Sequence, residues 1–363
     1  MTAVLSRQTL NRALLARQLL LRRAEMPVYD AVAHLYGLQA QAPNPPYLAL
    51  WNRLDGFAPE ELSQLITDRR AVRIALMRST IHLVTAEDCL ALRPVLQPAH
   101  DRGFAVTYGK RLTGLDLYTV AAHGRELVEA RPRTFAELGA LLAERFPGHD
   151  AEALAPVVRT RVPLVQVPPR GLWGSSGQAA HTSAESWLSA ELTAPDPARM
   201  VLRYLAAYGP ASVQDMQAWS GLTRLKEVVA GLRPQLVTFR DERGVELYDL
   251  PDAPRPDAAE PAPLRLLGEF DSVLLSHADR TRIISDEHRK RVFTINGIIK
   301  ATVLADGFVA GTWRIERGRD AATLRVEPFG QLSDVQRAAL GEEARRLLAF
   351  AVPGVKAYHV DAG

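Results

Sequence analysis

One pattern recurs three times in the first 250 residues, and it limits the folds that this chain can adopt. Helical segments are followed each time by two short apolar, strand-like runs with a turn between them. Helices followed by a two-stranded hairpin are the order of a winged helix. The sequence therefore predicts a repeated winged-helix architecture without a close sequence repeat. The paired runs are residues 72–77 with 81–84, 164–167 with 172–173, and 235–240 with 245–250.

Capping residues show where several of the helices begin. Thr134 is followed three positions later by Glu137, and Ser212 by Asp215, so each pair forms a capping box. The second pair lies within residues 209–232, where Gly-Pro breaks one helix and a later glycine turns the chain into another. This segment is the clearest helix-turn-helix in the chain.

The composition changes near residue 250. Residues 251–263 are rich in proline, alanine and acidic residues, which is typical of a linker. The chain then becomes β-rich, with predicted strands that include residues 272–275 and 292–295 and hairpin turns at Asn296-Gly297 and Asp306-Gly307. Ser333 with Gln336 caps one late helix. We therefore expect an α+β fold with a small C-terminal β-barrel-like domain. The expected parts are winged helix 1 at 1–98, winged helix 2 at 99–193, winged helix 3 at 194–250, the linker at 251–263 and the β-rich domain at 264–363.

The bulk composition is that of a globular protein. The chain has 363 residues, of which 47% are hydrophobic and 23% are charged. Its single cysteine, Cys89, excludes an intramolecular disulfide and a cysteine-based metal site. No apolar run reaches the roughly 18 residues that a membrane span needs, and no secretory segment opens the chain. We therefore expect a cytoplasmic protein without a membrane partner.

Positive charge occurs in clusters, although the formal net charge is only +3. Arginines and lysines gather at residues 69–73, 289–291 and 314–319, among other places. Each cluster alone is best explained as a group of solvated side chains. Together they allow a basic face on the folded chain, and winged helices with a basic face favour DNA binding.

Two glutamines stand two positions apart at Gln39-Ala40-Gln41, which we call the glutamine step. Residues i and i+2 project to the same side only where the backbone is extended. Pro43 disfavours a helix at this point, and Gly37 permits a break before it. We therefore expect a short extended segment between two helices, with both amides on one surface and Ala40 turned inward.

Other motifs that carry chemistry are scarce. The chain has no glycine-rich phosphate loop, no G-x-S-x-G motif and no histidine pair at zinc-site spacing, so we expect no metal and no cofactor. His82 lies in a predicted wing strand, where a lone histidine is more often structural. The run from His277 to Arg280 follows an apolar segment. It either presents polar groups from a loop or forms a solvated turn.

The order of these features resembles the AlkZ-type family of bacterial winged-helix DNA glycosylases, which includes the YcaQ-like enzymes. The resemblance covers nearly the whole chain. The chain has the glutamine version of the family's catalytic motif, as in the crosslink-unhooking AlkZ branch, and not the aspartate version of the YcaQ branch. The segments that carry the resemblance are residues 37–41 with the proline-rich exit, 78–85 (Arg-Ser-Thr-Ile-His-Leu-Val-Thr), 270–280 (Phe-Asp-Ser-Val-Leu-Leu-Ser-His-Ala-Asp-Arg) and 311–314 (Gly-Thr-Trp-Arg).

This resemblance implies tandem winged helices that form a C-shaped basic channel. It implies excision of N7-alkylated purines from double-stranded DNA, including interstrand crosslinks such as those of azinomycin in producer bacteria. Gln39 and Gln41 would be catalytic. The residues expected to contact DNA or to support the two glutamines are Arg78, Ser79, Thr80, His82, His277, Asp279, Arg280, Arg314, Arg317 and Arg319.

Paired amides suit this chemistry. An N7-alkylated purine is positively charged and leaves as a neutral base, so no general acid is required. Amide oxygens can orient a water molecule but cannot take its proton. The step carries no lysine nucleophile, which predicts a monofunctional glycosylase without a covalent intermediate.

A crosslinked purine cannot be flipped into a closed pocket, so we expect an open site and a probe that enters the duplex. The best candidate for this probe is the hairpin at residues 313–323, which carries arginines at its tip. A solvated hairpin is the alternative interpretation.

Beyond the site, we expect a monomer without an obligate protein partner. The main alternative function is a non-catalytic winged-helix DNA-binding transcriptional regulator. An RNA-binding protein is disfavoured because the motifs of common RNA-binding modules are missing.

Overall fold

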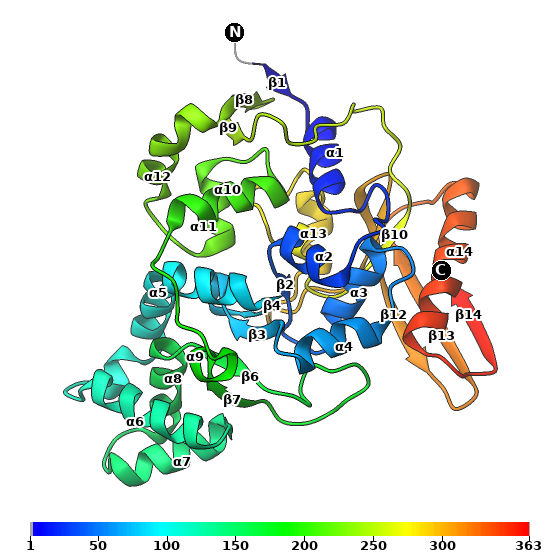
Figure 1. The fold of residues 1–363 in the computed structure, drawn as a ribbon. Helices are drawn as coiled ribbons and strands as arrows, with labels where there is room; N and C mark the ends of the chain where they lie inside the picture. Colours follow the sequence, from blue (N-terminus) through cyan, green and yellow to red (C-terminus); the bar gives the residue numbers. More distant parts are fainter. Residues whose placement is uncertain (1–2, 363) are drawn as a thin grey trace.

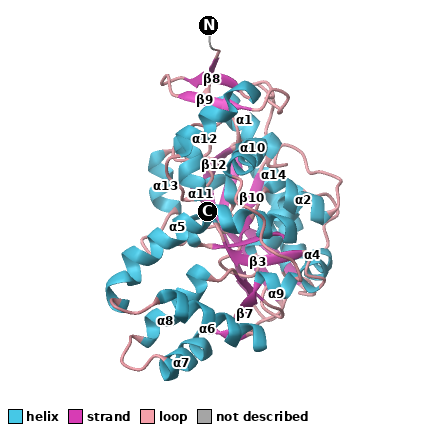
Figure 2. Ribbon diagram, turned by 60° about the vertical axis from the view of Figure 1, so that its left-hand side comes forward, coloured by secondary structure: helices cyan, strands magenta, loops and turns pink. Residues whose placement is uncertain are grey.

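The computed structural model describes residues 3–362 and shows a mixed α/β fold (Figure 1). The C-terminal sheet and its helix lie on the opposite side of the molecule from the helices of residues 86–161 (Figure 1). Three of those helices, in residues 117–161, lie at one end of the molecule, and the hairpin of residues 237–249 lies at the other (Figure 2). Within the described residues, no helix is long and apolar enough to cross a membrane.

The first part of the chain has the helices and hairpin that the sequence predicts. Strands β3 and β4 pair antiparallel from Ala71 opposite Thr85 to Ala75 opposite Ile81. The short strand β2 pairs with the other edge of β4, which holds the glutamine step against the hairpin. The elements are α1 (Arg7–Arg17), α2 (Val28–Leu35), β2 (Leu38–Gln39), α3 (Pro45–Arg53), α4 (Pro59–Thr67), β3 (Ala71–Ala75), the 3-10 turn η1 (Met77–Ser79) and β4 (Ile81–Thr85).

The second part differs from the expectation in one strand. Strand β6 pairs with β7, and not with residues 172–173 as predicted. The reason is packing, because Trp173 lies against Tyr47 of α3 with ring centroids 4.9 Å apart. The expected boundary at 98/99 falls inside helix α5, so the chain does not break there. The elements are α5 (Ala86–Tyr108), η2 (Gly109–Leu112), α6 (Leu117–Ala130), β5 (Arg133–Thr134), α7 (Phe135–Arg145), α8 (Ala151–Arg161), β6 (Leu164–Gln166), β7 (Ala180–Ser183) and α9 (Ala184–Leu188).

The hairpins of these two parts join into one sheet. Strand β3 pairs with β6 through Arg73 opposite Gln166, and the six strands run in the order β2-β4-β3-β6-β7-β5. The two parts are therefore fixed to each other by backbone hydrogen bonds as well as by side-chain packing.

The third part confirms the predicted helix-turn-helix and its hairpin. The Ser212–Asp215 capping box opens α11, and Gly221 ends it in a left-handed conformation with φ of +81°. The chain's first strand, β1 (Val4–Leu5), adds to this hairpin in parallel with β8. The elements are α10 (Pro197–Tyr208), α11 (Val213–Ser220), α12 (Leu225–Leu232), η3 (Arg233–Gln235), β8 (Val237–Asp241) and β9 (Glu246–Asp249).

The predicted linker contains no helix or strand in residues 251–263 and lies against α1. The guanidinium of Arg12 donates from Nε to the carbonyl of Glu260 at 2.5 Å. Arg17 donates from Nε to the carbonyl of Pro254 at 3.3 Å and forms a buried ion pair with Asp249. These contacts fix the path of the linker.

The barrel expected at residues 264–363 is wrong, because the five strands described there form an open sheet. Their order is β10-β11-β12-β13-β14, which leaves β10 and β14 as edges. Helix α14 contacts β10, β13 and β14, and it starts at the predicted Ser333–Gln336 capping box. The elements are β10 (Arg265–Leu267), η4 (Ser272–Leu274), α13 (Asp286–Val292), β11 (Thr302–Ala305), β12 (Phe308–Arg317), β13 (Ala321–Pro328), α14 (Asp334–Ala351) and β14 (Ala357–Asp361).

Two strands predicted in this part are also wrong. Residues 272–275 form a 3-10 turn, because the Asp271 side chain accepts from the amide of Val273 at 3.2 Å. Val292 is the last residue of α13, and residues 293–295 follow it. That helix is stabilised by a Ser285 cap, acidic residues in its first turn and basic residues in its last turn. Local capping outweighs the β-branched composition at both places.

The cores do not follow the expected domain boundaries. One hydrophobic cluster joins α2, α3 and α4 to the C-terminal sheet and α14. Another joins α1, β3, β4 and α5 to α10, α11 and α12. Only the cluster around α6, α7 and α8 is confined to the second part. The first part of the chain is therefore packed between the third part and the C-terminal sheet.

Candidate active site at the glutamine step

The backbone before the glutamine step makes a tight turn out of α2. Tyr36 ends the helix with φ of 55°, and Gly37 follows with φ of +106°. A Cβ atom on Gly37 would lie 2.9 Å from the Cε of Met77 and 3.3 Å from the Cγ1 of Val84. The glycine therefore lets the backbone approach the β3–β4 hairpin closely, which a larger residue would prevent.

The step is extended at Gln39, the last residue of β2, and the chain bends at Gln41. Ala40 is turned inward, as expected. The amide of Ala40 donates to the carbonyl of Ile81 at 2.7 Å, and the Ala40 side chain is fully buried. Arg73 donates from Nη2 to the carbonyl of Ala40 at 2.8 Å. Gln39 is 7% exposed, whereas Gln41 lies at the surface.

Both glutamine side chains reach the same segment, at the turn between β3 and β4. Arg78 donates from Nη2 to Oε1 of Gln39 at 2.9 Å. The backbone amide of Ile81 donates to Oε1 of Gln41 at 3.2 Å. Among the described residues, neither amide nitrogen has a hydrogen-bond partner. Each side chain therefore keeps its NH2 donors and a second oxygen lone pair for a ligand.

The turn that carries Arg78 has an unusual backbone. Arg78 and Ser79 have φ values of 54° and 59°, a conformation that costs energy in residues other than glycine. Arg78 donates from Nη1 to the carbonyl of Trp219 at 2.7 Å, and the backbone of Gly221 lies against it. Helix α11 therefore helps to hold the turn in place. Burial lowers the pKa of Arg78 to about 10, so the guanidinium stays charged at neutral pH.

Four arginines surround this turn without a carboxylate partner among the described residues. Besides Arg78, they are Arg102, which donates to the carbonyl of Gly221, and Arg159, which donates from Nη2 to the carbonyl of Ser79 at 3.0 Å. The guanidinium of Arg280 lies 4.8 Å from the ring centroid of Phe293 and contributes to lowering the pKa of Arg78. The carbonyl bonds of Arg78, Arg102 and Arg159 and the ring contact of Arg280 leave the positive charge without a carboxylate. Such a site attracts phosphate groups.

The polar residues of the turn have structural partners. The Thr80 hydroxyl donates to the carbonyl of Met77 at 3.1 Å. His82 lies opposite Gln39 in the β2–β4 ladder, is 2% exposed, and donates from Nδ1 to the carbonyl of Thr80 at 3.0 Å. Burial, with a further contribution from Arg78, lowers the pKa of His82 to about 3. His82 is therefore neutral at physiological pH and cannot serve there as a charged acid.

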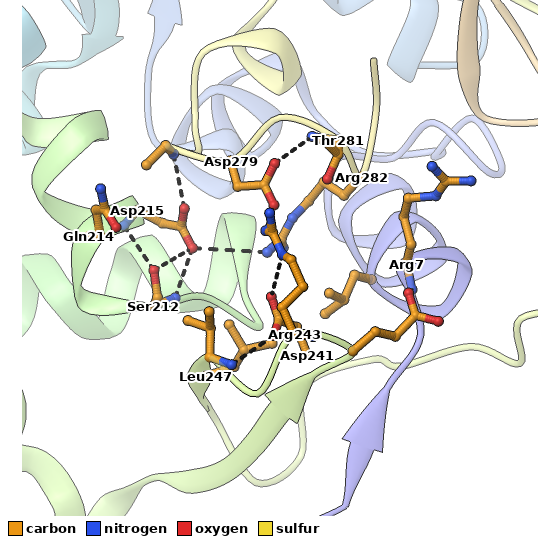
Figure 3. Close-up of a pocket in the computed structure, with 14 residues that line it drawn as sticks. Arg7, Ser212, Gln214, Asp215, Asp241, Arg243, Leu247, Asp279, Thr281 and Arg282 are labelled. Atoms are coloured by element: carbon orange, nitrogen blue, oxygen red, sulfur yellow. Dashed lines mark hydrogen bonds and ion pairs between the residues drawn. The ribbon is translucent and has the colours of Figure 1, made fainter. Parts of the chain in front are cut away.

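The run from His277 to Arg280 is divided between two environments. His277 is buried and donates from Nε2 to the carbonyl of Tyr208 at 3.1 Å, and burial lowers its pKa well below the usual range. Asp279 forms an ion pair with Arg243 beside a separate cavity of about 330 Å³ (Figure 3). Asp215 on α11 accepts from the amide of Ala278 at 2.9 Å in the same region (Figure 3). These contacts bind the C-terminal part to α10 and α11.

The candidate probe hairpin is formed by β12 and β13. Arg314 is paired with Glu316 at 3.1 Å, and Arg317 donates from Nη2 to the carbonyl of Ala351 at 3.0 Å. Arg319 lies exposed at the turn, with no ion pair to any described residue. Of the three predicted arginines, Arg319 is therefore the one most available to a ligand.

The described residues contain no group of three or more histidine, cysteine, aspartate or glutamate side chains that could hold a metal ion.

Comparison with known proteins decides the family. A family model described as DNA glycosylase AlkZ-like matches residues 32–350. The chain belongs to the AlkZ-like DNA glycosylase family. It is accordingly an enzyme that hydrolyses N-glycosyl bonds, which decides against the non-catalytic regulator. The match covers the glutamine step and most of the C-terminal sheet.

Relatives of this AlkZ-like chain come from Streptomyces sahachiroi. The chain is 26% identical over 355 residues to an interstrand DNA cross-link repair glycosylase, with 90% of the chain and 92% of that protein covered. The solved structure of the DNA glycosylase AlkZ superposes with a TM-score of 0.78 at 21% identity, covering 99% of both chains. The second comparison shows that the whole fold is shared.

Two arginines of the candidate site are absent from the site residues that the sequence predicts. Arg102 comes from α5 and Arg159 from α8, and both converge on the turn only in the folded chain. Neither has a sequence neighbour with a recognised role. Their signal is the missing carboxylate partner, which only the structure reveals.

Proposed function

We propose that this protein is a monofunctional glycosylase that removes N7-alkylated purines from double-stranded DNA and unhooks interstrand crosslinks. Gln39 and Gln41 orient the attacking water. The observation that carries the proposal is that both amide oxygens are anchored on the same turn, by Arg78 and by the amide of Ile81. The crosslink repair activity in the name of the Streptomyces relative supports the substrate class.

The reaction follows from the charge of the substrate. Alkylation at N7 makes the purine a cation, and cleavage of the bond from N9 to C1′ releases a neutral base. The sugar then carries the positive charge of an oxocarbenium ion. A water held by the free lone pairs of the two amide oxygens is directed at C1′. Its proton passes to solvent or to a DNA phosphate, because the amides cannot accept it.

The arginines hold the DNA. In this proposal Arg78, Arg102, Arg159 and Arg280 neutralise phosphates near the lesion, so that the negatively charged backbone compensates their excess charge. Ser79 and Thr80 form the turn that carries Arg78, and His82 supports it as a neutral group. His277 and Asp279 act through their contacts with α10 and with the turn between β8 and β9.

The exposure of Gln41 suits a crosslinked substrate, because a purine tied to both strands cannot enter a closed pocket. We assign Arg319 at the β12–β13 turn as the group that enters the minor groove, with Arg314 and Arg317 supporting the hairpin.

The test uses duplex DNA that carries a single N7-methylguanine, and a second duplex that carries an N7–N7 interstrand crosslink. Alkali cleavage reveals the abasic sites. We expect excision by the wild-type protein and a loss of at least about a hundredfold in Gln39→Ala plus Gln41→Ala, the scale found when groups that position a reactant are removed. Gln331→Ala, which changes an exposed glutamine outside the site, is the matched control. Equal rates in the double variant and the wild type would reject the proposed role of the pair.

A further inference from the structure

Two adjoining cavities lie past the glutamine step, between the start of α3 and the C-terminal sheet. One has a volume of about 350 Å³ and is mostly apolar, with walls that include Pro43, Leu48, Trp313 and Ile315. The other has a volume of about 240 Å³ and shares Glu269, Trp313 and Arg314 with the first. It is more polar, because Lys300, Arg325 and Glu327 also line it. Because the walls are shared, the two form one groove, which we call the Glu269 groove.

The groove is continuous with the candidate active site. Its wall begins at Ala42, the residue directly after Gln41. On the other side, the Ser272 hydroxyl donates to the carbonyl of Gly37 at 3.3 Å, so the segment from Glu269 to Ser272 runs beside the step. A Cβ atom on Gly268 would lie 3.0 Å from Leu48 of α3, which fixes the position of the neighbouring Glu269.

Glu269 has no partner for its charge. Its carboxylate makes no hydrogen bond or ion pair with a described residue. Arg314 and Arg325 line the groove but are paired with Glu316, and Lys300 lines the second cavity without an ion pair to Glu269. Glu269 is exposed where it lines the groove, and partial desolvation raises its pKa. Its carboxylate can therefore meet a cation or a hydrogen-bond donor that enters the groove.

We propose that the Glu269 groove binds the substituent that an alkylating agent leaves on N7, and that Glu269 selects substituents that carry an amine. This inference rests on the proposed function, since it assigns the substrate class of the same site. Apolar walls with one or two placed polar groups are typical of small-molecule sites, and the first cavity lies within their usual size range. A methyl group on N7 would leave the groove empty, whereas a chain of several atoms would reach it.

The experiment compares three adducts of guanine in the same duplex. They are N7-methylguanine, the nitrogen half-mustard monoadduct with an amine in its chain, and the sulfur half-mustard monoadduct with a neutral thioether at the same place. Single-turnover rates are measured for each. The wild-type protein is expected to excise the amine adduct faster than the thioether adduct.

Two variants separate the charge of the groove from its shape. Glu269→Gln is expected to lower the ratio of the amine rate to the thioether rate about tenfold, as the loss of a charge-assisted hydrogen bond does. Asn44→Phe places a ring in the groove from an exposed position and is expected to lower the rates of both bulky adducts relative to methyl. Glu342→Gln removes an exposed carboxylate of α14 outside the groove and is the control. Each ratio is taken within one preparation, so a partly unfolded variant does not change it.

The outcomes are distinct. If wild-type protein excises N7-methylguanine but the two ratios stay at the wild-type values in Glu269→Gln and Asn44→Phe, the groove does not bind the substituent and the inference is overturned. If N7-methylguanine and both bulky adducts are all left intact by the wild-type protein, the proposed function itself fails.

Discussion

Arg78 holds the side chain of Gln39 through a hydrogen bond of 2.9 Å from Nη2 to Oε1. Its other terminal nitrogen donates to the carbonyl of Trp219 at 2.7 Å. One guanidinium thus links a proposed catalytic amide to helix α11. The orientation of the amide depends on this link, because Gln39 has no other side-chain bond to a described residue.

Replacement of Arg78 by lysine should therefore slow the reaction. Lysine keeps the positive charge but lacks the planar fork that reaches two acceptors. The loss of a charge-assisted hydrogen bond costs about 1.5–3 kcal/mol, or roughly a ten- to hundredfold fall in the single-turnover rate. Binding of undamaged duplex should change much less than the rate. A rate equal to that of the wild type would show that the link does not orient Gln39.

Replacement of Gly37 by alanine should destabilise the fold. The added Cβ would meet the Cε of Met77 at 2.9 Å, and the φ of +106° is strained for any residue with a side chain. Strain and overpacking together cost about 1–3 kcal/mol, visible as a lower midpoint of urea unfolding. Gly56→Ala is the control, because Gly56 has φ of +66° but no atom within 4 Å of its Cβ position. If both variants lost equal stability, contact with the hairpin would not be the reason for the glycine.

Acid should destabilise the protein partly through His82. Its pKa is lowered to about 3 in the folded chain, against about 6.5 for an unperturbed histidine. The unfolded state therefore binds a proton that the folded state excludes, and stability is lost as the pH falls below about 6.5. Below pH 6.5, His82 lowers the free energy of unfolding by about 1.4 kcal/mol for each pH unit, until the pKa of the folded state is reached.

Urea unfolding of the wild-type protein and of His82→Gln between pH 7 and pH 5 measures this slope. The variant should lose less stability over this range, although it starts from a lower value. Identical pH dependence in the two proteins would mean that His82 does not stay neutral when buried. The wild-type excision rate should show no step from His82 between pH 5 and pH 8, since the residue is neutral throughout.

The arginines without carboxylate partners should contribute to DNA affinity through phosphates. Arg102→Ala and Arg159→Ala are each expected to weaken binding of undamaged duplex and to reduce the slope of log K against log salt by about 0.9 for each phosphate that the protein no longer neutralises. Fluorescence anisotropy over a range of salt concentrations gives both quantities. Arg345→Ala, at an exposed position of α14, is the control. A salt slope equal to that of the control would place these arginines outside the DNA interface.

Much of the fold could be predicted from the sequence, because many elements begin and end on local signals. The capping boxes at Thr134 and Ser212 act within four residues and are present as predicted. The failures concern pairing between distant segments. The residues around 172–173 give no sign that Trp173 packs on Tyr47. Because it does, β7 pairs with β6 in the place predicted for residues 172–173. Whether the C-terminal sheet closes into a barrel likewise depends on which strands pair, and not on their composition.

The sequence by itself determined the glutamine step, since Gly37 and Pro43 restrict the backbone within a few residues of the two amides. Only the tertiary structure decided what surrounds them. Arg78 reaches Trp219 across 141 positions of the chain, and Arg159 reaches Ser79 across 80. A backbone conformation is set by neighbours in sequence, whereas a charged environment is set by neighbours in space, and folding alone brings those together.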